Sequence, residues 1–349
     1  MTQNKKEKFL IVGPAWVGDM VMAQSLFILL KQTYPDSEIT VTAPQWTLPI
    51  LDRMPQVDSH FATDFSHGEL ALGRRRRLGK SLREQGFTSS IVLPNSFKSA
   101  LLPYFANVPR RIGWRGEWRI PLLNDCRVLD KTKFPKMVER FAALGVPANA
   151  ARNEFPPRPR LAVDEENVAL SLACLDLNPN AKVVAICPGA EFGEAKQWPA
   201  QYYAQLSNEL IKHGFEVWLF GSANDQEIAA QIESGISSDY RGGLQNLAGR
   251  TNLAQAIDLL SLAKVCVSND SGLMHIAAAL DLPIVAIFGS TSPDFTPPLA
   301  DKVTLLTTDI ECRPCFQRQC PLGHLRCLKE ILPSTAVSSI AALLGEKLQ

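Results

Sequence analysis

Three short segments carry residue types that could move a proton or bind a phosphate. The first, residues 13–19, reads Gly-Pro-Ala-Trp-Val-Gly-Asp and ends on the carboxylate of Asp19. A carboxylate at the start of a helix can serve as a general base, but it can equally cap the helix. The glycines do not follow the dinucleotide-binding fingerprint. The segment therefore disfavours a nicotinamide cofactor and leaves a catalytic or a capping carboxylate open.

The second segment, residues 187–199, contains Gly189, Glu191 and a single lysine, Lys196, and ends in Gln-Trp-Pro. A glycine-containing loop that leads into a helix can cradle a phosphate. The Gly-Lys-Ser/Thr ending of a Walker loop is missing. A phosphate cradle and an ordinary connection are both compatible with this loop.

The third segment, residues 268–275, reads Ser-Asn-Asp-Ser-Gly-Leu-Met-His. Asp270 or Ser271 could cap the helix that follows, and Gly272 permits close approach of a ligand to backbone amides that suit a diphosphate. A histidine in the first turn, here His275, is more often a packing or capping residue, yet its position favours a functional role.

A fourth group consists of cysteines with C-x2-C-x4-C-x6-C spacing: Cys312, Cys315, Cys320 and Cys327. Four thiols so close in sequence could bind zinc or iron, although the spacing differs from the two separated pairs of a zinc ribbon. Reduced thiols or a local disulfide are the alternatives.

Each of the first three segments follows a short apolar run, so strands and helices should alternate as in parallel βαβ units. Strands are expected at 8–13, 39–43, 90–93, 183–187, 216–220, 264–268 and 283–288. Helices are expected at 17–34, 46–53, 68–85, 97–106, 200–212, 252–263 and 271–280. Ligands of such folds bind at the carboxyl ends of the strands, where the three segments lie.

The length of 349 residues and the 46% hydrophobic content suffice for two hydrophobic cores. Three prolines between residues 154 and 161 indicate an extended linker. We therefore expect an α/β protein with two Rossmann-like domains, 1–160 and 161–349, facing each other across a cleft. The last helix could pack back on the first domain. No secretory signal or spanning helix is expected, since the start is polar and no long apolar run follows.

The net charge of +1 hides an asymmetry between the two parts of the chain. Residues 1–160 contain 24 lysines and arginines against 14 acidic residues, whereas the remainder contains 12 against 21. The first part should therefore face an anionic partner, such as a phosphorylated lipid or a membrane surface, unless the charges are simply solvated. The arginines at 74–77 could form a basic amphipathic helix on a membrane or a solvated face. No nucleic-acid-binding module accompanies the charge.

The combined motifs resemble the lipopolysaccharide heptosyltransferase family over nearly the whole chain. They are Gly-Asp-Met at 18–20, Pro-Gly-Ala at 188–190 with Lys-Gln-Trp-Pro at 196–199, Phe-Gly-Ser at 220–222, Asn-Leu-Ala-Gly at 246–249 and Asn-Asp-Ser-Gly-Leu-Met-His at 269–275. The segments 94–100, 113–117 and 292–298 are most similar to the branch that adds the second heptose, heptosyltransferase II.

The resemblance implies a GT-B fold and an inverting glycosyltransferase of the cytoplasmic face of the inner membrane. It would move L-glycero-D-manno-heptose from ADP-heptose to the first heptose of the lipopolysaccharide inner core, heptosyl-Kdo2-lipid A. By this resemblance Asp19 is the general base and Lys196 neutralises the departing diphosphate. No cofactor would be required and no nucleic acid bound.

The resemblance also assigns binding residues. Donor binding falls to Gly189, Glu191, Lys196, Ser222, Asp225, Glu227, Thr251, Asp270, Ser271, Gly272 and His275. Acceptor phosphates and carboxylates would meet Asn95, Ser96, Lys98, Arg111, Arg115 and Arg119, since arginine pairs bidentately with such anions. Another GT-B enzyme, such as a different heptosyltransferase or an epimerase, and a two-lobed ligand-binding protein are the alternatives.

Overall fold

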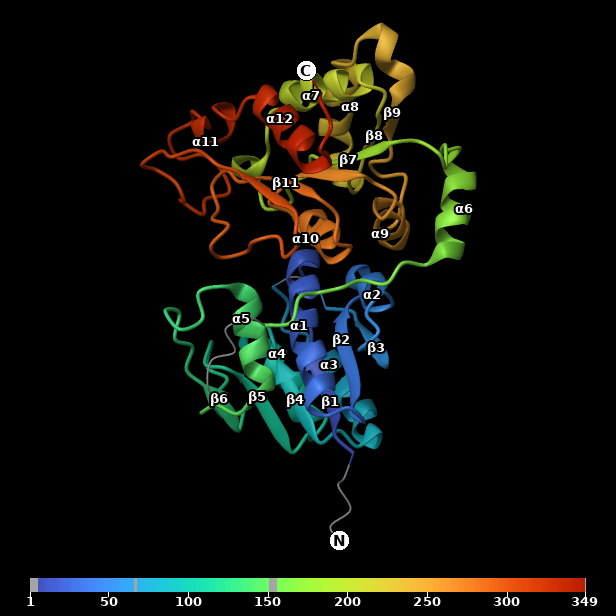
Figure 1. Cartoon of the computed structure of the whole chain (residues 1–349). Coiled ribbons are helices and arrows are strands. Elements are labelled where there is room, and N and C mark those ends of the chain that lie inside the picture. Colours follow the sequence, from blue (N-terminus) through green and yellow to red (C-terminus); the bar gives the residue numbers. More distant parts are fainter. Residues whose placement is uncertain (1–5, 66–67, 151–155, 349) are drawn as a thin grey trace. The chain divides into compact units, whose positions relative to one another are not determined.

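The computed structural model describes residues 6–65, 68–150 and 156–348, and it divides the chain into two compact units, Met1–Pro159 and Arg160–Gln349 (Figure 1). Each unit is built around one parallel sheet. Parallel strands need a crossover connection, usually a helix, between consecutive strands. The alternating pattern of the sequence follows from this requirement.

The described residues of the N-terminal unit form a six-stranded sheet in the order β3-β2-β1-β4-β5-β6. Its strands are β1 (Lys8–Val12), β2 (Glu38–Pro44), β3 (Ser59–Thr63), β4 (Ser89–Val92), β5 (Arg110–Trp114) and β6 (Asp125–Arg127). The chain first builds the sheet outward from β1 through β3 and then continues on the other side of β1 from β4. The topological switch point therefore lies between β1 and β4, where α/β sheets bind ligands.

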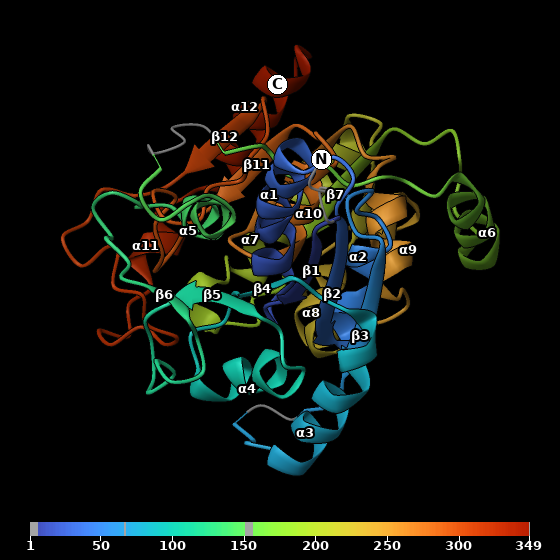
Figure 2. The same cartoon turned by 90° about the horizontal axis from the view of Figure 1, so that it is seen from below.

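The helices of this unit cover both faces of the sheet. They are α1 (Val17–Thr33), α2 (Leu48–Leu51), α3 (Leu72–Ser81), α4 (Phe97–Phe105) and α5 (Met137–Ala142), with short 3-10 turns at Gln45–Thr47, Leu82–Gln85 and Ala143–Gly145. Figure 2 shows α1 and α5 on one face and α3 and α4 on the other. At Gly79 a Cβ atom would lie 2.6 Å from the Cβ of Phe105, so a glycine is what permits α3 to pack this closely on α4.

The C-terminal unit repeats the same topology. Its sheet has the order β12-β11-β10-β7-β8-β9, with strands β7 (Val183–Cys187), β8 (Glu216–Leu219), β9 (Leu244–Asn246), β10 (Val265–Asn269), β11 (Ile284–Ile287) and β12 (Val303–Leu306). The central strands are completely buried, as Val-, Ile- and Ala-rich strands of a doubly covered parallel sheet should be. The switch point of this unit lies between β7 and β10.

The described part of this unit contains seven α-helices, the first of which precedes β7. They are α6 (Glu165–Leu175), α7 (Ala200–Lys212), α8 (Gln226–Ser234), α9 (Leu253–Leu260), α10 (Gly272–Ala279), α11 (Arg326–Lys329) and α12 (Pro333–Leu344). Short 3-10 helices stand at Glu194–Lys196, Ala223–Asp225 and Ser238–Gly243. The last helix, α12, packs on α7 and on β10, β11 and β12 of its own unit.

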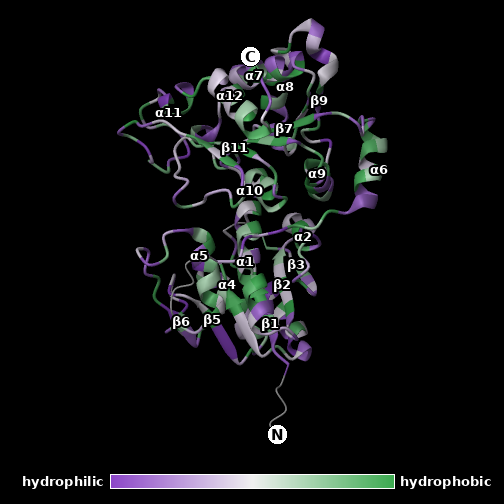
Figure 3. Cartoon of the chain, viewed as in Figure 1, coloured by the Kyte–Doolittle hydropathy of each residue, from purple (hydrophilic) through white to green (hydrophobic). Residues whose placement is uncertain are grey.

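The predicted α/β class with two Rossmann-like units is confirmed. Every expected strand is present within one or two residues, and the hydrophobic residues concentrate in the strands and their covering helices (Figure 3). The helix expected at 46–53 is shorter, because a 3-10 turn precedes the four residues of α2. The strands β3, β5, β6, β9 and β12 were not predicted. No helix among the described residues is long and apolar enough to cross a membrane.

Candidate active site

Two loops meet at the switch point of the C-terminal unit. Lys196 lies in the loop after β7, and Asp270 follows β10, the neighbouring strand. The Lys196 Nζ donates to Asp270 Oδ2 at 2.6 Å and lies 3.3 Å from the Asp270 carbonyl oxygen. The Thr291 hydroxyl, in the loop after β11, donates to the same Oδ2 at 2.6 Å. The loops after three adjacent strands thus place a cation, a carboxylate and a hydroxyl in contact with one another.

This ion pair is shielded from water. The side chain of Lys196 is 13% exposed and that of Asp270 is 4% exposed, and the ammonium lies 4.9 Å from the centre of the Phe192 ring. Low solvent access strengthens both the ion pair and the cation–π contact. An ammonium has three N–H donors, so one beyond the two contacts to Asp270 can reach a ligand oxygen. Asp270 therefore fixes the position of Lys196, a role beyond the helix cap or donor contact that the sequence suggested.

His275 lies on α10 and is buried. The pKa of His275 is lowered to about 4, mainly because burial disfavours the charged imidazolium. The nearby Asp270 carboxylate raises this pKa, and the Lys196 ammonium lowers it. The imidazole is therefore neutral at neutral pH. It can donate or accept a hydrogen bond but supplies no positive charge to a bound phosphate.

Asn269, the last residue of β10, connects the surrounding elements. Its Oδ1 accepts hydrogen bonds from the Trp198 amide at 3.1 Å and the Tyr203 hydroxyl at 2.9 Å, and its Nδ2 donates to the Pro188 carbonyl at 2.7 Å. The side chain is completely buried. One amide group thereby fixes the loop after β7 and the start of α7 relative to β10.

The N-terminus of α10 is suited to an anion. Ser271 occupies the N-cap position with extended backbone, yet its hydroxyl makes no capping hydrogen bond and instead lies 3.2 Å from the Ser268 hydroxyl. The capping role considered for Asp270 and Ser271 is therefore wrong. The amide groups of Gly272 and the next residues form the positive end of the helix, where a phosphate is stabilised.

The loops after β7 and β8 converge on Asp225. Its Oδ2 accepts hydrogen bonds from the Ser222 amide and the Ser222 hydroxyl, both at 2.8 Å. A Cβ atom on Gly189 would lie 2.5 Å from Asp225 Oδ1, so the glycine is required for this close approach. Among the other proposed donor contacts, Glu191 and Glu227 are exposed, and Thr251 is half-buried beside the Leu247 carbonyl.

In the N-terminal unit the candidate residues again flank the switch point. Asp19 lies in the first turn of α1, which follows β1, and is half-buried. Trp46 donates from its indole Nε1 to the Ala15 carbonyl at 3.0 Å, which ties the loop before α1 to the segment after β2. Asn95, Ser96 and Lys98 follow β4, with Ser96 at the N-cap of α4. The two loops belong to neighbouring strands of one sheet.

Two of the arginines predicted to bind the acceptor have structural partners instead. Arg119 is completely buried, and its guanidinium donates to the Trp114 carbonyl, the Pro94 carbonyl and, at 3.0 Å, Asn95 Oδ1. Burial lowers its pKa to about 10. Arg119 therefore holds the loop after β4 to the loop after β5, and its assignment as an acceptor contact is wrong.

Arg111 is similarly engaged, since it donates to the Leu122 carbonyl at 2.7 Å and the Val108 carbonyl at 2.6 Å. Arg115, in contrast, is exposed in the loop after β5. Of the three predicted acceptor arginines, all of which the structure describes, Arg115 alone is exposed.

The arginine run forms a helix, but its four members differ. Arg75 is buried, stacks 3.9 Å above the Phe65 ring centre and donates to the Leu70 carbonyl at 2.8 Å. Arg74 pairs with Glu69 and Asp64. Only Arg76 and Arg77 are exposed. The uniformly basic face that the sequence suggested is therefore reduced to about half of the run.

Two residues of the candidate site are not predicted from the sequence. Asn269 appears there only as part of a motif, and Thr291 does not appear at all. Both follow a predicted strand at its carboxyl end, and this position is the sequence feature that could have indicated them. Their hydrogen-bonding partners are 66 to 81 and 21 residues away in sequence, respectively, so no local pattern could reveal them.

Comparisons with known proteins agree with this architecture. Residues 75–326 match the model of glycosyltransferase family 9 (heptosyltransferase). The chain is 46% identical over 345 residues to lipopolysaccharide heptosyltransferase 2 of Salmonella typhimurium, covering 97% of this chain and 99% of that protein. A structure of ADP-heptose lipopolysaccharide heptosyltransferase II of Escherichia coli superposes with a TM-score of 0.88 at 43% identity, covering 97% of this chain and 98% of the other.

A more distant likeness shows how far the fold is preserved. A family 9 glycosyltransferase of Veillonella parvula superposes with a TM-score of 0.85 at 17% identity, over 99% of each chain. The match of residues 75–326 to the family model and the 46% identity over 97% of the chain place this chain in glycosyltransferase family 9, the heptosyltransferases.

Proposed function

We propose that this glycosyltransferase moves heptose from ADP-heptose to the heptosylated inner core of lipopolysaccharide, with inversion at the transferred carbon. The observation that carries the choice of substrates is the 46% identity to the Salmonella typhimurium heptosyltransferase 2 over nearly both full lengths. The structure supports the chemistry, because a lysine and a helix N-terminus meet where a diphosphate would have to be stabilised.

In this proposal the C-terminal unit binds the sugar nucleotide. The diphosphate lies at the N-terminus of α10, with Lys196 supplying the positive charge that the buried, neutral His275 does not. Asp270 and Thr291 keep the ammonium in place. Asp225, Glu227 and Thr251 lie around the loops that would receive the ribose and adenine. Charge that develops on the leaving diphosphate is thereby met by groups already in position.

The N-terminal unit would bind the acceptor and activate its hydroxyl. Asp19 accepts the proton from that hydroxyl as the oxygen attacks the anomeric carbon and the bond to the diphosphate breaks. Asn95, Ser96, Lys98 and Arg115 are the candidates for contacts with acceptor phosphate and carboxylate groups. Because Lys196 and the amides of α10 supply the positive charge, we expect no metal or other cofactor in the transfer step.

The decisive experiment offers purified enzyme ADP-heptose with either Kdo2-lipid A or its mono-heptosylated form, with EDTA added to the assay. Transfer to the heptosylated acceptor alone is the expected result. Transfer to Kdo2-lipid A instead would assign the enzyme to the preceding step. Activity with neither acceptor would point to another sugar nucleotide and overturn the proposal.

The role of Asp19 is tested by the Asp19→Asn variant. We expect transfer to fall by 10²-fold or more, as is typical when a general base is lost. ADP affinity, measured by titration calorimetry, should stay within about a factor of two, because a general base acts on the acceptor hydroxyl and the proposed nucleotide contacts belong to the other unit. A variant that retains most of its turnover would exclude Asp19 as the base.

We further propose transient contact with an anionic membrane surface through α3. Leu70 and Leu72 are about half exposed, and Arg76, Arg77 and Lys80 are exposed beside them. Apolar and basic side chains together favour interfacial binding. Co-sedimentation with vesicles containing phosphatidylglycerol should fall when Arg76 and Arg77 are changed to glutamine. Equal binding of both proteins would contradict this role of α3.

A further inference from the structure

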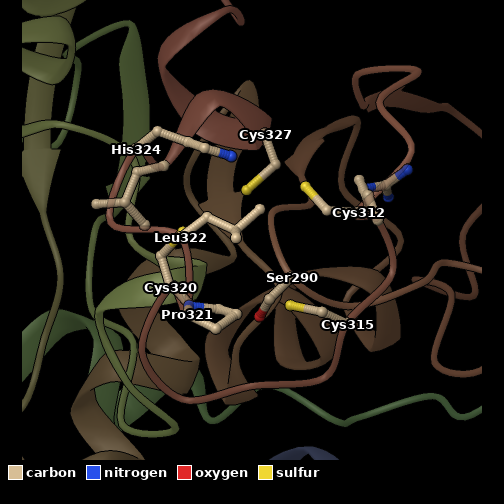
Figure 4. Close-up of a pocket in the computed structure, with 11 residues that line it drawn as sticks. Ser290, Cys312, Cys315, Cys320, Pro321, Leu322, His324 and Cys327 are labelled. Carbon is tan, nitrogen blue, oxygen red and sulfur yellow. The ribbon is translucent and has the colours of Figure 1, made fainter.

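The four clustered cysteines take no part in the proposed transfer, yet they surround one small cavity. Cys312, Cys315, Cys320 and Cys327 line it together with Ser290, Arg313 and His324, and its volume is about 20 Å³. We call this the cysteine pocket. Figure 4 shows the side chains around it, with the sulfur of Cys312 directed toward Cys327. A cavity of this size holds a single occupant no larger than a water molecule.

The lining of the cysteine pocket combines four sulfur atoms with one cation. Cys320 begins a tight turn, in which the Gly323 amide donates to the Cys320 carbonyl at 3.0 Å. Cysteine sulfur is a ligand that favours Zn²⁺ and iron over hard cations such as Mg²⁺. Arg313 adds positive charge, because its guanidinium lies near Cys327 and donates to the Gly289 carbonyl at 2.9 Å.

All four thiols are reduced in this structure, and they do not yet share a common centre. Among the residues that the structure describes, no three His, Cys, Asp or Glu side chains stand close enough to hold a metal ion. The segment has room to adjust, since Leu322 also lines the pocket and is 61% exposed, so it can turn outward into solvent.

We propose that the cysteine pocket binds one Zn²⁺ or Fe²⁺ ion through its four thiolates, as a structural site. Four sulfur ligands favour these ions in tetrahedral geometry. Each thiol releases its proton to solvent as its sulfur–metal bond forms, and the ion loses its water ligands. The resulting doubly negative centre is partly balanced by Arg313, which lines the same pocket.

The site would support the residues around Asp270. The segment that carries the cysteines contacts both loops of the candidate active site. The Ala195 amide donates to the Arg318 carbonyl at 3.1 Å, and the Phe316 amide donates to the Ser290 carbonyl at 2.8 Å. Arg313 also donates to the Thr291 carbonyl at 3.1 Å. Metal binding would thereby fix the neighbours of Lys196 and Thr291, the two partners of Asp270.

Metal analysis of the untagged full-length protein tests the site directly. Protein purified without chelators, under both aerobic and anaerobic conditions, should contain about one zinc or iron ion per chain by mass spectrometry of the elements. The Cys315→Ser/Cys320→Ser double variant should lose it. Cys174→Ser is the matched control, because Cys174 is an exposed cysteine on α6. Less than about a tenth of an ion per chain in every wild-type preparation would overturn the proposal.

A second measurement covers the case in which the double variant does not fold. The wild-type protein is stripped with a mercurial reagent and a chelator, reduced, and titrated with Co²⁺. A thiolate-to-cobalt charge-transfer band that saturates at about one equivalent is expected for tetrahedral sulfur ligation. A titration with no such band, or a disulfide between two of these cysteines in the isolated protein, would overturn the proposal.

The coupling to the active site depends on the proposed function and has its own readout. ADP should bind more weakly to the metal-free protein than to the reconstituted protein, as measured by calorimetry. Equal ADP affinities would overturn the coupling, while metal content and the cobalt band decide the site independently.

Discussion

At the scale of single residues, the candidate active site depends on the hydrogen-bonding and ion-pair partners of one buried carboxylate, that of Asp270. Asp270 has a cation and a hydroxyl as partners of the same oxygen, at 2.6 Å each. A buried carboxylate that loses a partner is left with an uncompensated desolvation cost. Thr291 is therefore more than a neighbour of the site, because its hydroxyl completes the environment that positions Lys196.

The Thr291→Val variant tests this role. Removing the hydroxyl should lower the free energy of unfolding by roughly 1–3 kcal/mol, the cost of an unsatisfied buried group. Urea unfolding measures the change. Ser339→Ala is the control, because its hydroxyl bonds a carbonyl of its own helix at an exposed position and its loss should cost under about 0.5 kcal/mol. Equal effects of the two substitutions would contradict the special role of Thr291.

His275 predicts a pH dependence of stability. Its pKa of about 4 lies below the ordinary 6.5, because burial disfavours the charged form. Below pH 6.5 the unfolded chain takes up a proton that the folded chain refuses. Stability from this residue is thus complete above the unfolded pKa and falls as pH decreases toward 4, by about 3 kcal/mol in all.

The measurement compares urea unfolding of wild type and His275→Gln between these two pH values. The variant should show a shallower loss of stability on acidification than wild type. Parallel curves for wild type and His275→Gln would exclude the linkage.

At the scale of elements, loops at strand ends must approach each other closely, and glycine permits this. In Gly189→Ala the new Cβ would meet Asp225 Oδ1 at 2.5 Å and displace the carboxylate from its place beside Ser222. We expect weaker ADP binding in calorimetry and an unchanged fold by circular dichroism. Gly242→Ala is the matched control, since a Cβ there meets no atom within 4 Å. ADP affinity equal to wild type would exclude Asp225 from nucleotide binding.

Some strands are predicted well from the sequence and others are not, and the difference follows from how deeply their side chains are buried. β7 was predicted residue for residue because all five of its side chains are buried, so its composition is uniformly apolar. β3 and β9 stand at sheet edges with partly exposed side chains, and their residues Ser-His-Phe-Ala-Thr and Leu-Gln-Asn have no such signature. An edge strand is defined by its neighbour in the sheet, which local periodicity does not contain.

Arginine shows the same limit within the site. A run of four arginines suggested one basic face, but the helical turn directs Arg75 inward onto Phe65. Arg119 looked like an anion-binding residue from its charge alone, yet it is enclosed by the carbonyls of Pro94 and Trp114. The residue type predicts the chemistry that is available. Only the packing of the folded chain decides whether that residue faces a ligand.

At the scale of the whole molecule, the chain builds one topology twice. Both sheets reverse their winding beside their first strand, and several candidate residues of each unit follow the two strands that flank that point. Asp19 and Lys98 follow β1 and β4, whereas Lys196 and Asp270 follow β7 and β10. Position in the topology therefore explains why Lys196 and Asp270, 74 residues apart in sequence, come into contact.

The two units also differ in charge, and this difference predicts how salt affects each substrate. The excess of basic residues in 1–160 should attract an anionic acceptor, while the nucleotide site that we propose in the acidic remainder is built around the largely buried Lys196–Asp270 pair. Raising ionic strength from about 0.01 to about 0.1 M shortens the Debye length from about 30 to about 10 Å. The KM for the acceptor should therefore rise several-fold, by the order expected for electrostatic steering, and the KM for ADP-heptose should change much less. In an Arg76→Glu/Arg77→Glu variant, the KM for the acceptor should rise less with ionic strength than in wild type, since the variant removes exposed positive charge from α3. If the KM values for both substrates rise equally with ionic strength, the charge asymmetry has no part in acceptor binding.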